Sequence, residues 1–88
     1  NGLGNEEWLA ERFGAERILG CLCFVCLNRI APGDIVHTPP GHIVLGEYNR
    51  PCSTRAEQIA SLFRQAGVPA DTTDHLALTR WDKLMWNI

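Results

Sequence analysis

The 88-residue sequence predicts a small α/β fold, on the basis of three observations. A capped helical pattern opens the chain, and apolar strand-like segments follow it between residues 18 and 47. Two further helical patterns follow, from residue 54 to 66 and from residue 75 onward. Glycine and proline separate these segments at short intervals, so the chain has the organisation of at most one small domain.

The first helix is predicted to follow the glycine-rich turn at residues 1–4. Asn5 is expected to cap it, because an asparagine side chain can accept a hydrogen bond from a free amide of the first turn. Glu6 and Glu7 come next, where acidic groups interact favourably with the helix dipole. Gly14 is expected to end the helix after about ten residues.

The strands are predicted to form an antiparallel meander. Residues 18–27 read as a long strand buried on both faces, and residues 31–34 (APGD) read as a turn. Residues 34–38 and 42–47 read as two more strands, separated by residues 39–41 (PPG). Three cysteines lie within the first strand, so we expect buried, reduced thiols and a reducing cytoplasm.

The next helix has a clear start and end. Thr54 and Glu57 form a capping-box pattern, and Gly67 is expected to stop the helix. A stripe at helical spacing is expected to face the core: Ala56, Ile59, Ala60, Phe63 and Ala66.

The last helix is expected to begin at a cap formed by Asp74, after a short extended segment. Its apolar stripe comprises Leu78, Trp81, Leu84, Met85 and Ile88. The sequence ends within this stripe, so we expect the chain to be part of a larger protein. The alternative is that the stripe packs on its own small domain.

Composition argues against two classes of function. The net charge is −2 and the basic residues are scattered, which does not suit a nucleic-acid-binding protein. No apolar run reaches the roughly 18–20 residues that a membrane span requires. A zinc site is not expected, because Cys21 and Cys23 share one face of a strand whereas Cys26 points to the other. The three histidines are scattered and are expected at the surface.

Two groups of residues are candidates for ligand binding. Lys83 and Asn87 lie one helical turn apart, where an ammonium and an amide can together hold a keto acid. On spacing alone, a solvated lysine and asparagine would be the commoner explanation. Asn1 begins an NGLG turn that would allow a ligand to approach the backbone, although such a turn usually just precedes a helix. No GxGxxG phosphate-binding motif occurs in the sequence.

These motifs, taken in order, resemble the middle of the ketopantoate reductases (2-dehydropantoate 2-reductases). The resemblance covers essentially the whole chain: an N-G-x-G turn, a helix with E-x-x-L, a strand segment ending in H-x-V-L-G-E, and a closing W-x-K-L-x-x-N. The closing motif is the most specific part.

The resemblance implies the second half of a doubly wound, Rossmann-like NADP-binding domain at residues 1–74. Residues 75–88 would then begin the helix that leads into an all-helical C-terminal domain. The implied activity is the NADPH-dependent reduction of 2-dehydropantoate to pantoate, a step of coenzyme A biosynthesis, in the cytoplasm. No metal is implied, and a homodimer of the intact enzyme remains open.

The resemblance also assigns roles to three residues. Lys83 matches the catalytic lysine, Asn87 matches the asparagine that helps to hold substrate, and Asn1 matches the asparagine at the junction of cofactor and substrate. The isolated chain is expected to be inactive, because the phosphate-binding motif lies outside it. The alternative function is a free-standing interaction module whose apolar last helix docks on a partner and leaves Lys83 in solvent.

Overall fold

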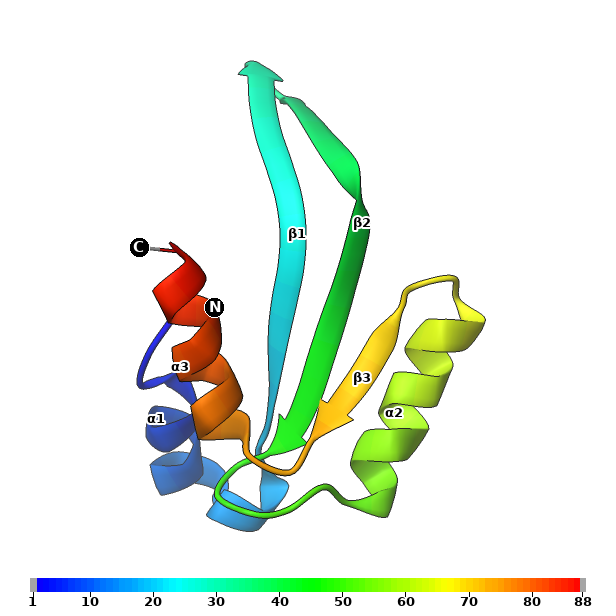
Figure 1. The fold of residues 1–88 in the computed structure, drawn as a ribbon. Helices are drawn as coiled ribbons and strands as arrows, with labels where there is room; N and C mark the ends of the chain where they lie inside the picture. Colours follow the sequence, from blue (N-terminus) through cyan, green and yellow to red (C-terminus); the bar gives the residue numbers. More distant parts are fainter. Residues whose placement is uncertain (1, 88) are drawn as a thin grey trace.

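The structure is a computed structural model that describes residues 2–87, except for the side chains of Pro40 and Asn87. The elements in chain order are α1 (Asn5–Phe13), the short 3₁₀ helix η1 (Ala15–Arg17), β1 (Leu19–Ala31), β2 (Asp34–Glu47), α2 (Thr54–Gln65), β3 (Ala70–Thr73) and α3 (Leu76–Asn87). The α/β class predicted from the sequence is confirmed (Figure 1).

The sheet is mixed, with strand order β1-β2-β3. β1 and β2 form a long antiparallel hairpin around Pro32 and Gly33, so the predicted turn is confirmed. β3 instead pairs in parallel with β2, from Ile43↔Ala70 to Gly46↔Thr73. The predicted three-stranded antiparallel meander is therefore wrong, because its second and third strands are one strand. Residues 68–74 were expected only as a short extended segment, and they contain β3.

A bulge explains why the second strand looked like two. Between the pairs Phe24↔His42 and Cys26↔Thr38, only Val25 of β1 stands opposite residues 39–41 of β2. Pro39 lacks a backbone donor, and a bulge accommodates such a residue without ending the strand. The PPG segment thus bends the hairpin but does not break it (Figure 1).

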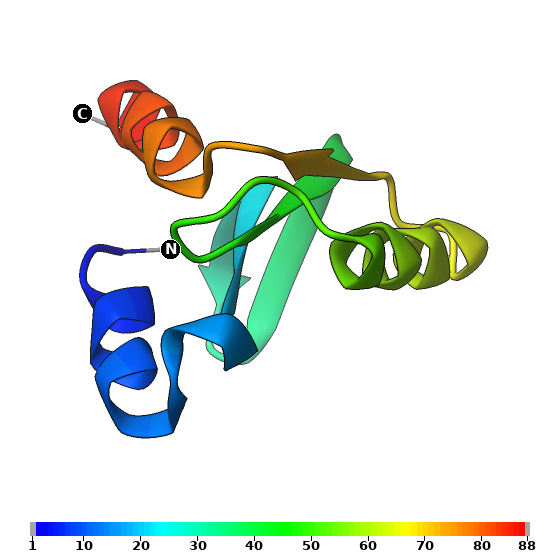
Figure 2. The ribbon, with the colours of Figure 1, turned by 90° about the horizontal axis from the view of Figure 1, so that it is seen from below.

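The segment from β2 through α2 to β3 is a β-α-β unit. Its two strands are parallel, and a parallel pair needs a crossover connection, which α2 supplies. α2 lies on one side of the sheet, whereas α1 and α3 lie on the other (Figure 2). The alternation of side chains along the strands therefore supplies two separate packing surfaces.

The surface under α2 holds the apolar core, formed by Ile43, Leu45, Ala60 and Ala70 with Ile59 packed against them. The surface under α3 includes Leu22, Val44 and Leu76, which are also buried. Ala56 and Ala60 confirm part of the predicted α2 stripe. Phe63 is 38% exposed and Ala66 is also exposed, so the last part of the predicted stripe does not face the core.

The predicted helix caps are shifted. Gly4, not Asn5, is the N-cap of α1, whereas Gly14 ends that helix as expected, with a positive φ. Ser53, not Thr54, caps α2 by accepting a hydrogen bond from the Ala56 amide. With the cap moved back by one residue, Glu57 no longer occupies the capping-box position, and its carboxylate accepts from the Thr72 hydroxyl instead. Asp74 was expected to cap the last helix. Its carboxylate accepts a hydrogen bond from the Cys52 amide, 2.8 Å away, and so contacts the loop before α2.

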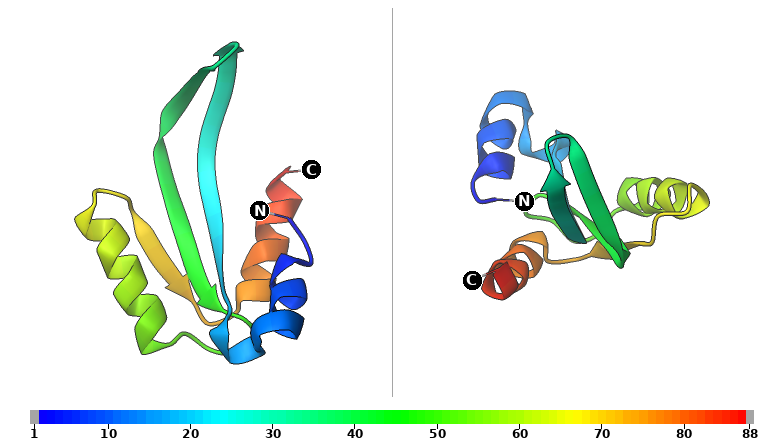
Figure 3. Two further views of the ribbon diagram at one scale, coloured as in Figure 1. Left: turned by 180° about the vertical axis from the view of Figure 1, so that it is seen from behind. Right: turned by 90° about the horizontal axis from the view of Figure 1, so that it is seen from above.

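The cysteine strand is not buried on both faces. β1 is an edge strand, and its side chains are mostly exposed beyond Phe24 because the hairpin extends past the helices (Figure 3). Cys21, Cys23 and Cys26 are all exposed, and none of the four cysteines forms a disulfide in the described residues. Position at the sheet edge, which hydropathy does not encode, accounts for the difference.

Candidate active site

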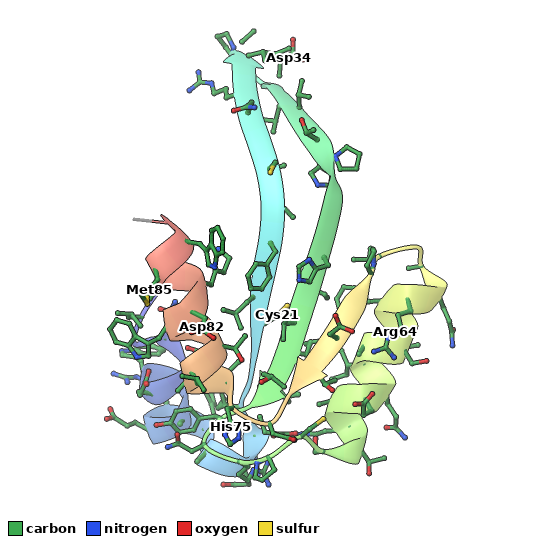
Figure 4. All side chains as sticks on the ribbon, in the orientation of Figure 1. Cys21, Asp34, Arg64, His75, Asp82 and Met85 are labelled. Atoms are coloured by element: carbon green, nitrogen blue, oxygen red, sulfur yellow. The ribbon has the colours of Figure 1, made fainter. Side chains whose placement is uncertain are left out.

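The buried face of α3 is polar as well as apolar. Leu76, Arg80 and Lys83 recur at helical spacing and are 5%, 7% and 8% exposed. Most of the apolar stripe predicted for this helix lies elsewhere: Leu78, Trp81 and Met85 are more than half exposed. Leu84 is partly buried, and Ile88 lies outside the described residues. Figure 4 shows Met85 on the side of α3 that faces away from the sheet.

Within residues 2–87, no helix has both the length and the apolar character that crossing a bilayer requires.

Lys83 therefore does not lie on a solvated face of the helix. Its Nζ atom lies 5.6 Å from the centre of the Phe24 ring, at a distance that allows a cation–π interaction. Phe24 is stacked on His42 across the β1–β2 ladder, with ring centroids 4.7 Å apart and planes 3° apart. The two strands thus provide an aromatic platform beneath the lysine.

The start of α3 lies directly on two glycines. Gly20 and Gly46 are partners across the ladder, on the face of the sheet that carries Leu22 and Phe24. A Cβ atom at Gly20 would lie 2.5 Å from Leu76 Cδ2 and 2.7 Å from Glu6 Oε1. The absence of a side chain at these positions therefore allows α3 and α1 to approach the sheet.

Arg80 connects α3 to the beginning of the chain. One of its Nη atoms donates to the Gly2 carbonyl, 3.0 Å away, and the other donates to the Glu6 carboxylate. The two side chains of the Glu6–Arg80 ion pair are 10% and 9% exposed. Burial lowers the pKa of the Arg80 guanidinium below its ordinary value.

A second buried carboxylate stabilises the loop between β2 and α2. Glu47 accepts hydrogen bonds from Arg55 Nε at 2.7 Å, from Arg50 Nη2 at 2.7 Å, and from the Ser53 hydroxyl. The Arg55 hydrogen bonds, followed by those from Ser53 and Arg50, lower the pKa of Glu47 to about 2, although burial acts in the opposite direction. Arg50 and Arg55 also donate to the Glu16 carbonyl, which ties η1 to this loop.

The other two residues that the sequence predicted for the site are Asn1 and Asn87. Asn1 lies outside the described residues. Asn87 is the last residue of α3, one turn after Lys83, but its side chain lies outside the description. The structure therefore places Lys83 and the backbone of Asn87 on one helix, and it joins that helix to the turn that follows Asn1.

The hollow beside the ion pair is too small for a substrate-sized ligand. A cavity of about 60 Å³ lies between α1 and α3 and is lined by residues that include Glu6, Tyr48, Arg80 and Trp81. Small-molecule sites usually measure roughly 300–1,000 Å³. Lys83 is not among the lining residues, so this cavity is separate from the lysine.

The lysine site can stabilise negative charge. In the part of the chain that the structure describes, Lys83 has no ion pair and no hydrogen-bond partner. The Lys83 side chain is largely buried, but its unpartnered Nζ atom is not among the atoms closed off from solvent, so the ammonium is accessible to an oxygen of a bound ligand that carries negative charge. Residues 2–87 contain no group of three or more His, Cys, Asp or Glu residues arranged to hold a metal ion.

Sequence reasoning did not predict Glu6, Phe24 or Arg80 as parts of the site. Arg80 had a usable signal, since it precedes Lys83 by one turn and must share its face of the helix. Glu6 was explained only by the helix dipole, because its partner is 74 residues away in the chain. Phe24 was one of many apolar residues in a strand, and only the packing of α3 distinguishes it.

Comparison with known proteins identifies similar chains. Residues 1–50 match the model of the family described as ketopantoate reductase PanE/ApbA. A 2-dehydropantoate 2-reductase from Nostoc sp. is 43% identical over 93 aligned residues. The alignment covers all of this chain and 29% of that relative. One from Archaeoglobus fulgidus is 31% identical, with coverage of 99% and 29%.

A solved structure gives the same result. The crystal structure of 2-dehydropantoate 2-reductase from Geobacter metallireducens GS-15 matches with a TM-score of 0.85 and 54% identity. The match covers 99% of this chain and 29% of that one. The chain therefore spans less than a third of the length of the relatives that it matches.

Proposed function

Since the chain belongs to the ketopantoate reductase family, we propose that it is the central segment of a 2-dehydropantoate 2-reductase. The proposed reaction is the reduction of the 2-keto group of 2-dehydropantoate to pantoate with NADPH. The observation that carries the proposal is the position of Lys83: largely buried, over the Phe24 ring, and without a counter-charge among the described residues.

The proposed domain organisation divides the chain before α3. Residues 1–74 form the second half of a doubly wound nucleotide-binding domain, and residues 75–88 begin the helix that leads into a helical domain. Support comes from the β-α-β unit, and from helices on both sides of the sheet. β1 and β3 are the edges of this sheet, and either can pair with a further strand.

Lys83 is the proposed catalytic residue. NADPH, when bound, supplies the hydride to the keto carbon, and negative charge then develops on the keto oxygen. The Lys83 ammonium donates a hydrogen bond to that oxygen, stabilises the charge and gives up a proton to complete the alcohol. Asn87, one turn later, orients the substrate, and Asn1 meets the cofactor and substrate at their junction.

The 88 residues suit the substrate better than they suit the cofactor. Lys83 fits a keto oxygen, but the sequence contains no GxGxxG turn to hold the pyrophosphate. Residues outside this chain would therefore hold most of the cofactor. We expect the isolated chain not to oxidise NADPH with 2-dehydropantoate, whereas the complete protein that contains it does.

The test is to replace Lys83 by alanine in the complete protein. We expect kcat to fall by roughly 10²–10⁴-fold, because the reaction loses its proton donor and a charge that stabilises the transition state. Arg12→Ala is the matched control, since Arg12 is a cation over an aromatic ring, 3.6 Å from the Trp8 centroid, on an exposed part of α1. A loss below about threefold for Lys83→Ala would remove this lysine from the chemistry.

A protein-interaction role is the second candidate function, and the exposed outer face of α3 favours it. Leu78, Trp81 and Met85 are 61%, 56% and 74% exposed. Under the reductase proposal this face packs against the helical domain of the same protein. The two candidate functions can be separated in the complete protein. Reductase activity that depends on Lys83 supports the reductase, because a docking module needs no lysine on the opposite face of α3.

A further inference from the structure

Within the described residues, Arg80 connects α3 to the first part of the chain through polar contacts. Arg80 is forked, and each arm of the fork reaches a different segment: one the carbonyl of Gly2, the other the carboxylate of Glu6 on α1. Both side chains are about nine-tenths buried. We call this arrangement, formed by Gly2, Glu6 and Arg80, the latch.

The position of the latch on α3 matters for Lys83. Leu76, at the start of the helix, lies on the glycine pair of the sheet, and Arg80 and Lys83 follow on the same face. Lys83 lies seven residues beyond Leu76, a distance of about 10 Å along the helix, so a tilt of about 6° about Leu76 would displace it by about 1 Å. Arg80 lies between these two points and opposes such a tilt.

The chemistry of the pair suits positioning better than stabilisation. A buried ion pair gains little net stability, because the desolvation of both charges offsets their attraction. A guanidinium nevertheless holds its acceptors in fixed directions, which a lysine in its place would not do. Gly20 contributes to this geometry, because the Glu6 carboxylate occupies the space where a side chain at that position would lie.

We propose that Arg80 is a positioning residue for Lys83, and that the latch sets the distance between the lysine and the turn at residues 2–4. This inference rests on the proposed function, in which Asn1, the residue before that turn in the sequence, and Lys83 of α3 act on the same substrate. The latch connects α3 to the turn at residues 2–4, although the turn and Lys83 lie about 80 residues apart in the chain.

The first experiment measures kinetics in the complete protein. Glu6→Gln removes one charge of the pair at nearly the same size, Arg80→Gln removes the other charge together with the guanidinium, and Arg80→Lys keeps the charge but loses the fork. We expect each glutamine variant to lower kcat by roughly 10–100-fold while KM for the cofactor changes little, because misplacement by about 1 Å is enough for such a loss. Arg80→Lys should fall between these variants and the parent.

A matched control addresses general destabilisation. The Arg64 Nε atom donates to the Ala70 carbonyl at 2.7 Å, so this arginine also joins a helix to another segment, but it does so on α2. Figure 4 shows Arg64 on the far side of the sheet from α3. We expect Arg64→Gln to leave kcat unchanged. An equal loss of kcat in this control would overturn the positioning role.

A second set of variants tests whether Arg80 acts through Lys83. In a Lys83→Ala background, Arg80→Gln should cause almost no further loss of kcat, because the group that it positions is already absent. A role confined to folding would instead multiply the two losses. Multiplied losses would therefore contradict the proposal.

Hydrogen exchange gives a readout that does not depend on activity. Arg80→Gln should speed exchange of the α3 amides after residue 80 and of the α1 amides, and leave α2 unchanged. Unchanged α1 and α3 would overturn the latch even in an active enzyme. If exchange speeds up as expected but the parent protein does not reduce 2-dehydropantoate, the proposed function fails while the latch stands as a structural contact.

Discussion

At the scale of single residues, the most informative feature of this chain is its buried charged side chains. Glu6, Glu47, Arg80 and Lys83 are all less than 9% exposed, which is uncommon for ionised residues. Three of them are paired: Glu6 with Arg80, and Glu47 with Arg50 and Arg55. Lys83 has no ion pair among the described residues, and this contrast supports its proposed role as the group that meets a ligand.

Glu47 leads to a prediction about acid stability. Its pKa is lowered from 4.5 to about 2 in the folded protein, mainly by the hydrogen bonds from Arg55. Its stabilising contribution is therefore complete above about pH 4.5 and is lost as the pH falls toward 2. We expect Glu47→Gln to lower the free energy of unfolding at neutral pH by on the order of 2 kcal/mol, with Arg50 and Arg55 partly exposed.

Thermal unfolding between pH 2 and pH 7 checks this prediction. The difference in Tm between Glu47→Gln and the parent should be largest at neutral pH and should shrink as the pH approaches 2. Glu11→Gln, a change at an exposed carboxylate of α1, should leave the profile unaltered. A difference in Tm that does not vary with pH would show that the Glu47 charge is not what stabilises the loop.

At the scale of secondary-structure elements, the close approach of α3 to the sheet determines where this helix lies. Gly20 and Gly46 remove two side chains from the sheet at the point where α3 begins, and Leu76 occupies the space. The hairpin also matters, because the bulge at residues 39–41 accommodates Pro39 while His42 still pairs with Phe24. The aromatic platform under Lys83 depends on that register.

Gly20→Ala tests the close approach. The added methyl group would meet both Leu76 and the Glu6 carboxylate at less than contact distance, so α3 or α1 must shift. We expect a loss of roughly 1–3 kcal/mol in the free energy of unfolding, measured by urea denaturation. Cys21→Ala is the neighbouring control on the other face of β1, and we expect it to cost less than about 0.5 kcal/mol. Equal effects at the two positions would argue against close packing at Gly20.

At the scale of the whole molecule, the chain presents two kinds of surface. The core between the sheet and α2 is closed, whereas the outer face of α3 and much of the hairpin are apolar and exposed. Because the chain spans less than a third of its relatives' length, we expect such surfaces to contact further parts of the same protein. The proposed helical domain would cover α3.

Oxidation of Met85 tests this arrangement. In the isolated chain the side chain is 74% exposed, so peroxide should oxidise it readily. In the folded complete protein we expect oxidation to be slower by on the order of tenfold, measured by mass spectrometry of the peptide that contains it. Unfolding the complete protein in urea should restore the fast rate. Equally fast oxidation in the folded complete protein would instead favour the interaction-module alternative.

The sequence by itself determined the α/β class, the hairpin turn at Pro32 and Gly33, the existence of all three helices and the family, because turn chemistry, periodicity and the W-x-K-L-x-x-N motif are local properties. Tertiary structure decided the parallel pairing of β3, the exposure of the cysteines on β1, and the burial of Arg80 and Lys83 in place of the apolar stripe of α3. Each of these depends on which segments meet across long separations in the chain. The contact between Arg80 and Glu6, 74 residues apart, is the clearest case, since neither residue identifies its partner through its neighbours in the sequence.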